Sequence, residues 1–227
     1  MTITLITGGN RGLGFETARQ LIQRGHTVWL GARDLKRGEE AAKKLGARAV
    51  QLDVTNDASV EAAARTVGTL DVLINNAGIS GAFRPAPELP LDEFRAVYET
   101  NVFGVVRVTR AMLPLLQKSG NPVIVNVGSG LGSFQTVHDT SRIESKLPSL
   151  AYSSSKSALS MVTVQYARGL PQLRVNVVDP GYTATEFNRH TGPQTVEDGA
   201  EIIVRMACIG RDGPTGTLSD RHGTVGW

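Results

Sequence analysis

The sequence contains very little cysteine and few aromatic residues. Of its 227 residues, one is a cysteine and 5% are aromatic. The single Cys208 excludes an internal disulfide, and no cysteines and histidines have the spacing of metal ligands, so we expect no metal site. A reducing, cytoplasmic location is consistent with this composition. The apolar residues around Cys208 and Trp29 predict that both side chains belong to the core.

Long hydrophobic runs and long basic runs are also absent. No stretch of about 18 apolar residues could span a membrane. Residues 1–7 are apolar but have no basic flank and run directly into glycines, which indicates a strand and not a signal peptide. The net charge is +3, with both signs spread along the chain and no basic arm. We therefore expect neither a membrane nor a nucleic acid as a partner.

Short β-rich runs alternate with amphipathic helical runs along the chain. Several of the β-rich runs are continuously apolar and β-branched, which is typical of parallel strands buried on both faces. The fold class predicted is α/β, with a single doubly wound parallel sheet (Rossmann-like), helices on both faces and one domain over 1–227. The strands are expected at Thr2–Thr7, His26–Leu30, Ala47–Leu52, Leu70–Asn75, Pro122–Val127 and Leu173–Val178, with a last short one near Thr217–Leu218.

Two segments are predicted to be long loops, Gly130–Ser149 and Gly181–Thr195. Both follow strand ends, where open α/β sheets bind their ligands. Helical residues resume near Val196, so the second loop can form only a short lid over the site. A short lid suggests an open site that tolerates bulky carbonyl compounds.

A glycine-rich segment, Thr7–Gly14, directly follows the first strand and opens a helix. Glycines at three positions let the backbone turn sharply and approach a pyrophosphate, and the helix presents its free N–H groups and positive dipole end to that anion. A structural glycine turn is the alternative, but the strand before and the helix after favour nucleotide binding. The predicted cradle contains Gly8, Asn10, Arg11, Gly12, Leu13 and Gly14.

Cations stand where NAD-binding folds usually carry an acidic residue for the ribose. Arg33 closes the second strand, Arg37 lies one turn further on, and Arg11 lies inside the glycine loop. Guanidinium groups at this point favour a 2′-phosphate, hence NADP(H). Asp34 could turn towards the ribose, although an aspartate before a helical run more commonly caps the helix.

The glycine loop, together with Asn75-Asn-Ala-Gly78, Ser129 and Tyr152-Ser-Ser-Ser-Lys156, resembles the short-chain dehydrogenase/reductase family. The resemblance covers nearly the whole chain. Residues 31–38 and 213–220 are similar to the NADPH-dependent carbonyl reductase branch of that family.

The resemblance implies a role for each matching residue. Asn101 corresponds to the helix asparagine that anchors a proton-relay water. Asp53 and Val54 correspond to the adenine contacts, and Asn75, Ala77 and Gly78 to the motif that supports the sheet and lines the ribose. The loop expected to fix the nicotinamide contains Pro180, Gly181, Thr183 and Thr185.

The chemistry is expected at Tyr152 and Lys156, which share a helix face because they are four residues apart. A nearby ammonium favours the phenolate and lowers the tyrosine pKa. Tyr152 could then protonate a carbonyl oxygen as hydride arrives, while Lys156 also holds the ribose hydroxyls and Ser129 binds the substrate oxygen.

Three functions remain open at this point. The favoured one is an NADPH-dependent reductase of aldehydes or ketones. The others are an NAD(P)-dependent secondary alcohol dehydrogenase and a non-catalytic nucleotide-sensing protein of the same fold.

The stretch between Ser129 and Tyr152 is longer than is usual in the family that the chain resembles. The extra residues, around Thr136–Leu147, are expected to bulge over the mouth of the site and to disturb the helix pairing by which many members of that family form tetramers. A monomer or homodimer is therefore favoured over a tetramer.

Overall fold

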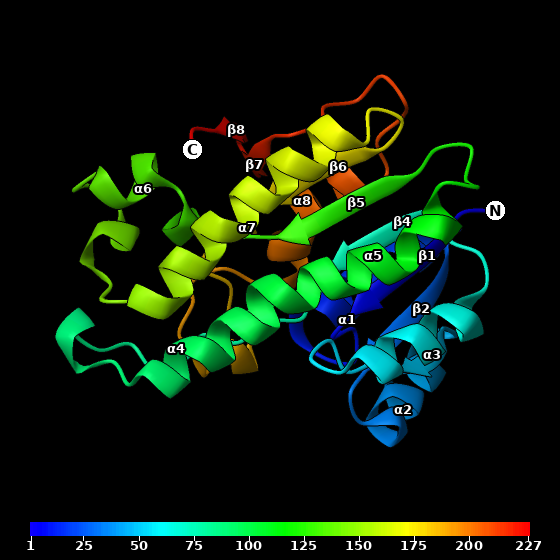
Figure 1. The fold of residues 1–227 in the computed structure, drawn as a ribbon, viewed down its shortest axis with the longest axis horizontal. Coiled ribbons are helices and arrows are strands. Elements are labelled where there is room, and N and C mark those ends of the chain that lie inside the picture. Colours follow the sequence, from blue (N-terminus) through cyan, green and yellow to red (C-terminus); the bar gives the residue numbers. More distant parts are fainter.

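Seven parallel strands and one antiparallel edge strand form a single sheet in the computed structural model, which describes residues 1–227 (Figure 1). The strand order is β3-β2-β1-β4-β5-β6-β7-β8, so the predicted fold class is confirmed. The strands are β1 (Ile3–Thr7), β2 (Thr27–Ala32), β3 (Arg48–Gln51), β4 (Val72–Asn75), β5 (Val123–Val127), β6 (Arg174–Val178), β7 (Leu218–Asp220) and β8 (Gly223–Val225).

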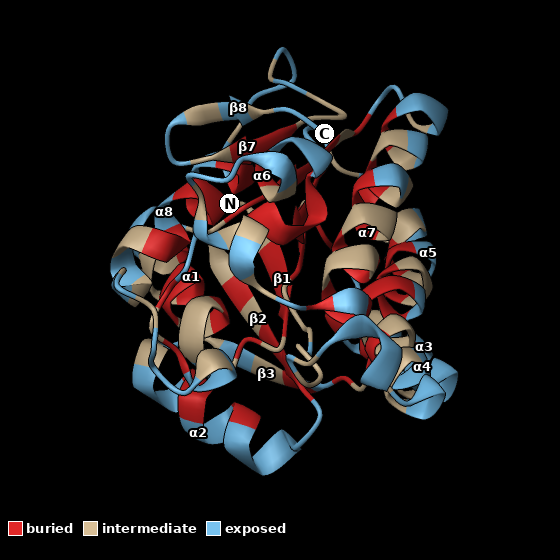
Figure 2. Ribbon diagram, turned by 90° about the vertical axis from the view of Figure 1, so that its left-hand side faces the viewer, coloured by how far each residue is buried: buried red, intermediate tan, exposed pale blue.

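Helices cover both faces of this sheet. Their bounds are α1 (Gly12–Gln23), α2 (Leu35–Leu45), α3 (Asp57–Val67), α4 (Leu91–Tyr98), α5 (Gly104–Leu116), α6 (Phe134–His138), α7 (Leu150–Gly169) and α8 (Val196–Ala207). One core joins the sheet to α1, α2 and α8, and the other joins it to α3, α5 and α7. Figure 2 shows the buried strands between these helical layers. None of the helices is long and apolar enough to cross a membrane.

The strands are apolar at consecutive positions because each side of the sheet is covered. Along β1, Leu5 points into one core and Ile6 into the other, and both are fully buried. Ile124 in β5 belongs to the core with Leu5, whereas its neighbours Val123 and Val125 belong to the core with Ile6. This alternation is the arrangement that continuous apolar runs predict for a parallel sheet between helices.

The segment Gly130–Ser149 differs from the expected long loop. It contains the 3-10 turns Gly130–Gly132 (η3) and Ile143–Lys146 (η4) as well as α6, and it lies beside the start of α7 (Figure 1). Ser133 caps α6 by accepting the N–H of Thr136, and its hydroxyl donates to the carbonyl of Gly226 at 2.6 Å. Contacts with the distant C-terminal residues therefore stabilise this segment.

One of the two residues expected in the core lies outside it. Cys208 is exposed, because α8 ends at Ala207 and buries the side chains before it while the thiol lies outside the core. Trp29 packs against the core formed with α3, α5 and α7, as expected, but it is half-buried, with the guanidinium of Arg48 5.3 Å from the centre of its ring. The last strand was expected near Thr217–Leu218 and begins at Leu218, but the hairpin that it forms with β8 was not anticipated.

Candidate functional site

The site lies at the carboxyl edge of the sheet, around the crevice between β1 and β4. The strand order reverses there, which is where open α/β sheets bind ligands. The hydroxyl of Thr7, at the end of β1, accepts the backbone N–H groups of Asn76 and Ala77, both at 3.0 Å. The amide of Asn76 donates to the carbonyls of Thr7 and Gly8. Asn76 therefore fixes the glycine loop, a role that the sequence signals only by its doubled asparagine.

The glycine loop has the conformation of an anion cradle. Gly8 and Gly12 have φ angles of 62° and 53°, a region that favours glycine. Gly14 is required for space, because a Cβ there would lie 2.7 Å from the Gly8 carbonyl oxygen. Helix α1 begins at Gly12 with no acidic residue of its own in the first turn, so the helix itself adds no negative charge to its positive end. Within the loop Asn10 is half-buried, Arg11 is exposed, and Leu13 packs against the core.

A hollow of about 270 Å³ lies beyond the ends of β2 and β3, and Arg33 and Asp53 line it together. Burial raises the pKa of Asp53, but hydrogen bonds from Thr55 and the charges of Arg33 and Arg107 outweigh burial and lower that pKa overall. The two residues thus present a cation and an anion in one recess. Val54, next to Asp53, is buried.

Asp34 and Arg37 lie on the surface beside this hollow. Asp34 caps α2 by accepting the backbone N–H of Arg37, which is the more common role of an aspartate before a helix. The guanidinium of Arg37 forms an ion pair with the same carboxylate at 3.5 Å, and its side chain is 75% exposed. Arg37 is therefore not among the residues that line the hollow with Arg33.

Asn75 and Asn101 are buried and hydrogen-bonded. The amide of Asn75 donates to Asn126 of the neighbouring strand β5 and to Thr109 of α5. Asn101 lies in the π-helical segment Glu99–Phe103, where the helix leaves α4 and enters α5. It exchanges two hydrogen bonds with the backbone of Ile79, both at 2.9 Å, and donates to Ser155. Asn101 thus ties α7 to the segment that follows β4, with Gly78 packed against its side chain.

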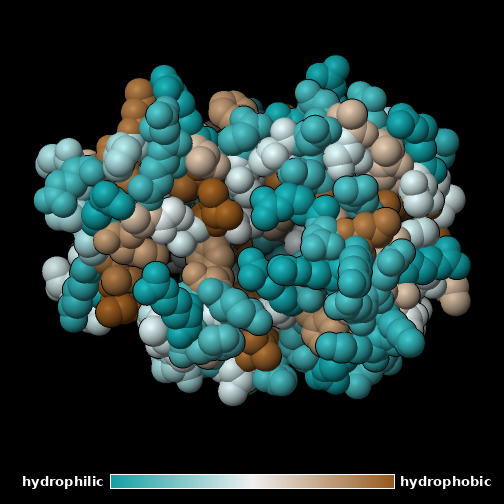
Figure 3. Space-filling model, turned by 90° about the horizontal axis from the view of Figure 1, so that it is seen from below, coloured by the Kyte–Doolittle hydropathy of each residue, from teal (hydrophilic) through white to brown (hydrophobic).

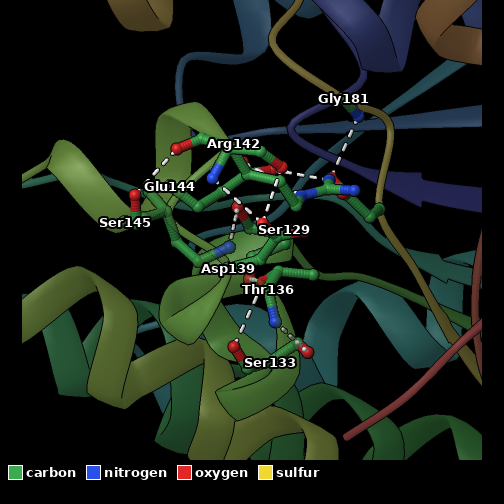
Figure 4. A network of polar contacts seen from close by, with 12 residues as sticks. Ser129, Ser133, Thr136, Asp139, Arg142, Glu144, Ser145 and Gly181 are labelled. Atoms are coloured by element: carbon green, nitrogen blue, oxygen red, sulfur yellow. Dashed lines mark hydrogen bonds and ion pairs between the residues drawn. The ribbon is translucent and has the colours of Figure 1, made fainter.

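Ser129, Tyr152 and Lys156 come together at the end of β5. Tyr152 is 9% and Lys156 5% exposed, both on α7. The ammonium of Lys156 lies 5.5 Å from the centre of the Tyr152 ring and donates to the carbonyl of Val127 at 2.7 Å. Ser129 follows β5, and its hydroxyl lies close enough to the Tyr152 phenol to lower the pKa of Tyr152. Figure 4 shows Ser129 among polar groups of the Gly130–Ser149 segment.

The pKa values in this group are set mainly by burial. Burial raises the pKa of Tyr152 strongly, the hydrogen bond with Ser129 opposes it, and the charge of Asp179 adds to it. Burial lowers the pKa of Lys156 to about 8. The pKa of Tyr152 is therefore raised and not lowered overall in this structure, in which the ammonium of Lys156 is directed to the Val127 carbonyl.

The segment after β6 closes the other side of the crevice. Thr183 and Thr185 are buried, and the side chain of Thr183 donates to the carbonyl of Pro180 at 3.2 Å. A Cβ on Gly12 would lie 3.5 Å both from the Thr185 methyl group and from the Glu186 carboxylate. The structure therefore brings the predicted nicotinamide loop against the glycine loop, although they are about 170 residues apart in the sequence.

Apolar side chains are exposed on the segments that surround the mouth of the site. Phe187 lies on the 3-10 turn Glu186–Asn188 (η5), is 44% exposed, and packs its ring 5.7 Å from that of Tyr152. Figure 3 shows a hollowed surface with apolar atoms on the side towards α4 and α6, and mostly polar atoms on the other side. The other exposed apolar residues on these segments are Ile79, Phe83, Phe134, Ile143, Leu150 and Tyr182.

Comparisons with known proteins agree with this geometry. Residues 2–195 match the short chain dehydrogenase family. The short-chain dehydrogenase anuI of Penicillium roqueforti (strain FM164) is 39% identical over 246 residues, which cover 99% of this chain and 97% of that protein.

Solved structures show the same similarity. The chain is similar to the NADPH-bound carbonyl reductase from chicken fatty liver, with a TM-score of 0.86, 25% identity and coverage of 100% of both chains. It is also similar to the 3-ketoacyl-(acyl-carrier-protein) reductase of Brucella melitensis complexed with NADH, with a TM-score of 0.85, 27% identity and coverage of 97% and 96%. A Rossmann-like sheet with this site defines an oxidoreductase of the nucleotide-binding kind. The chain belongs to the short-chain dehydrogenase/reductase family.

Proposed function

We propose that the chain is an NADPH-dependent reductase that transfers a hydride to the carbonyl group of an aldehyde or ketone. The observation that carries this proposal is the meeting of Ser129, Tyr152 and the buried ammonium of Lys156 beside the glycine loop. The phenol of Tyr152 is protonated at neutral pH, because the ordinary pKa of tyrosine is about 10 and burial raises it further here. A protonated phenol can donate its proton to a carbonyl oxygen as a general acid.

The chain's own residues perform the proton transfer. The hydroxyls of Ser129 and Tyr152 hold the carbonyl oxygen, and Tyr152 gives it a proton as the C–O bond is reduced. Lys156, whose pKa is about 8, is largely charged at neutral pH and stabilises the negative charge left on Tyr152. Asn101 positions α7, which carries both groups, through its bond to Ser155.

The residues present fit a dinucleotide. Gly8, Gly12 and Gly14 leave room for a pyrophosphate at the start of α1. In the hollow beyond β2, Arg33 would hold a 2′-phosphate, with Asp53 and Val54 at the adenine. The ribose and nicotinamide would lie along Ala77, Gly78 and the segment from Pro180 to Thr185. When bound, the nicotinamide supplies the hydride.

Replacing Arg33 with aspartate tests the choice of cofactor. Loss of the guanidinium and introduction of a carboxylate remove one charge-assisted contact and repel a 2′-phosphate, so the ratio of kcat/KM with NADPH to that with NADH should fall by about 10- to 100-fold. Lys118→Asp makes the same charge change in an exposed segment between α5 and β5 and should leave the ratio unchanged. An unchanged ratio in Arg33→Asp would refute the assignment of Arg33 and favour the NAD-dependent alternative.

The apolar mouth predicts substrates with a bulky hydrocarbon body. Phe187 lies against Tyr152 and offers a half-exposed ring to whatever occupies the crevice. Kinetics with small and bulky ketones, followed by loss of absorbance at the reduced nicotinamide band, should give higher kcat/KM for the bulky ones. Strict selectivity for one small ketone would contradict the prediction, and no turnover with either cofactor would favour a nucleotide sensor.

We also propose that the chain is a monomer or a homodimer.

A further inference from the structure

We infer that Asp179 is a positioning residue for the reaction, because its carboxyl group holds the Ser129 loop against the nicotinamide loop and places negative charge beside Tyr152 and Lys156. This inference rests on the proposed function. Asp179 ends the buried run of β6 and is 6% exposed. A buried carboxyl group at a strand end costs free energy unless it is hydrogen-bonded, so its partners indicate what it does.

The first set of partners is backbone N–H groups from two different loops. The N–H of Gly181, in the loop after β6, donates to Oδ1 of Asp179 at 3.0 Å. The backbone N–H of Gly130, next to Ser129, faces the same carboxyl group and lowers its pKa, and Oδ2 of Asp179 lies 2.9 Å from the place that a Cβ on Gly130 would occupy. One side chain therefore joins the residue after the carbonyl-binding serine to the start of the nicotinamide loop. Figure 4 shows Gly181 and Ser129 within the same polar network.

The position of Asp179 in the sheet also places it near the reacting pair. Val178, the residue before it, is paired with Val127, whose carbonyl accepts the Lys156 ammonium. Burial is the main cause of the shifted pKa values of Tyr152 and Lys156, and the charge of Asp179 raises both. The charge of Asp179 therefore shifts both pKa values in the same direction, whereas burial raises the pKa of Tyr152 and lowers that of Lys156.

Other charged groups from the surrounding elements face Asp179. The carboxylates of Glu144, in η4, and Asp179 both lie beside Gly130. A Cβ built on Gly130 would lie 2.7 Å from Oε1 of Glu144 and 2.9 Å from Oδ2 of Asp179. Arg142 pairs with Glu144 at 2.8 Å, and Asp220 of β7 is the remaining acidic neighbour. Burial, with the charges of Glu144 and Asp220, raises the pKa of Asp179, and the two N–H donors oppose this.

The test is the pH dependence of carbonyl reduction in Asp179→Asn. Asparagine keeps the shape and one acceptor oxygen but removes the charge, so the pKa of the proton donor should fall. The decline of kcat/KM at alkaline pH should then move to lower pH by about one unit. Asp139→Asn removes a carboxylate from the exposed surface of the same Gly130–Ser149 segment and should leave the profile unchanged.

The outcomes separate this inference from the proposed function. Wild-type turnover with an unmoved profile in a folded Asp179→Asn protein overturns the inference, even if kcat falls. A wild-type protein without turnover refutes the proposed function instead. If Asp179→Asn does not fold, the smaller Asp179→Ser serves as the second variant, and its profile must move in the same direction. A profile that moves to higher pH also overturns the inference.

Discussion

Tyr152→Phe is expected to lower kcat/KM for carbonyl reduction by about 10²- to 10⁴-fold, the usual contribution of a general acid. The substitution removes the phenol hydroxyl, so the carbonyl oxygen loses its proton donor and one of its two hydrogen bonds. The ring remains, and its contact with Phe187 at 5.7 Å should keep α7 in place. Steady-state rates measured at saturating NADPH, with the melting temperature, give the result.

A matched variant tests whether this loss is specific. Tyr166 lies on the same helix, α7, and packs against the core formed with α3 and α5. Tyr166→Phe removes the same atom far from Ser129 and should keep at least half of the wild-type rate. Equal activity of Tyr152→Phe and wild type would mean that another group donates the proton, and the proposed mechanism would be wrong.

Gly132→Ala is expected to destabilise the fold and to damage the site together. A Cβ on Gly132 would lie 2.7 Å from the carbonyl carbon and from the Cβ of Lys156, and 2.9 Å from the backbone nitrogen of Ser157. Backbone atoms of a long helix cannot move aside as the end of a flexible side chain can. The overpacking should cost about 1–3 kcal/mol, and η3 or Lys156 must shift.

The measurements are the free energy of unfolding in urea and kcat/KM for the same carbonyl. For a domain of this size, each kcal/mol corresponds to a fall of about 2–4 °C in Tm. Gly169→Ala is the control at the other end of α7, where an added Cβ meets nothing within 4 Å. It should be neutral or stabilising by up to about 1 kcal/mol, with normal activity. A Gly132→Ala protein that is as stable and active as Gly169→Ala would contradict the prediction, because η3 would then accommodate the added methyl group without loss of stability or activity.

Local sequence patterns predict those parts of the fold that depend on the residues of a single short segment. Continuous apolar runs such as Val123–Val127 identify the strands, because both faces of the sheet are covered. The glycine loop is equally predictable, since Gly8 and Gly12 adopt φ angles that other residues avoid. Helix starts at Asp34 and Asn56 follow from side chains that cap the backbone.

Features that depend on distant partners could not be predicted in this way. Strand β8 pairs only with β7, and Ser133 holds its segment through a carbonyl 93 residues away. Asp179 looks like an ordinary polar residue at a strand end until the loops of Gly130 and Gly181 are placed around it. The apolar neighbours of Cys208 predict a place in the core, but the thiol lies outside it because α8 ends at Ala207.

The contact between Gly12 and the segment after β6 has a consequence for the order of events at the site. The Glu186 carboxylate lies within 3.5 Å of the place a Cβ on Gly12 would occupy. The negative charge of Glu186 would repel a pyrophosphate that binds at the glycine loop. We therefore expect Glu186 to move away when the nucleotide binds, and its neighbour Phe187 to move with it. Nucleotide occupancy would in this way reshape the apolar mouth before a carbonyl compound enters.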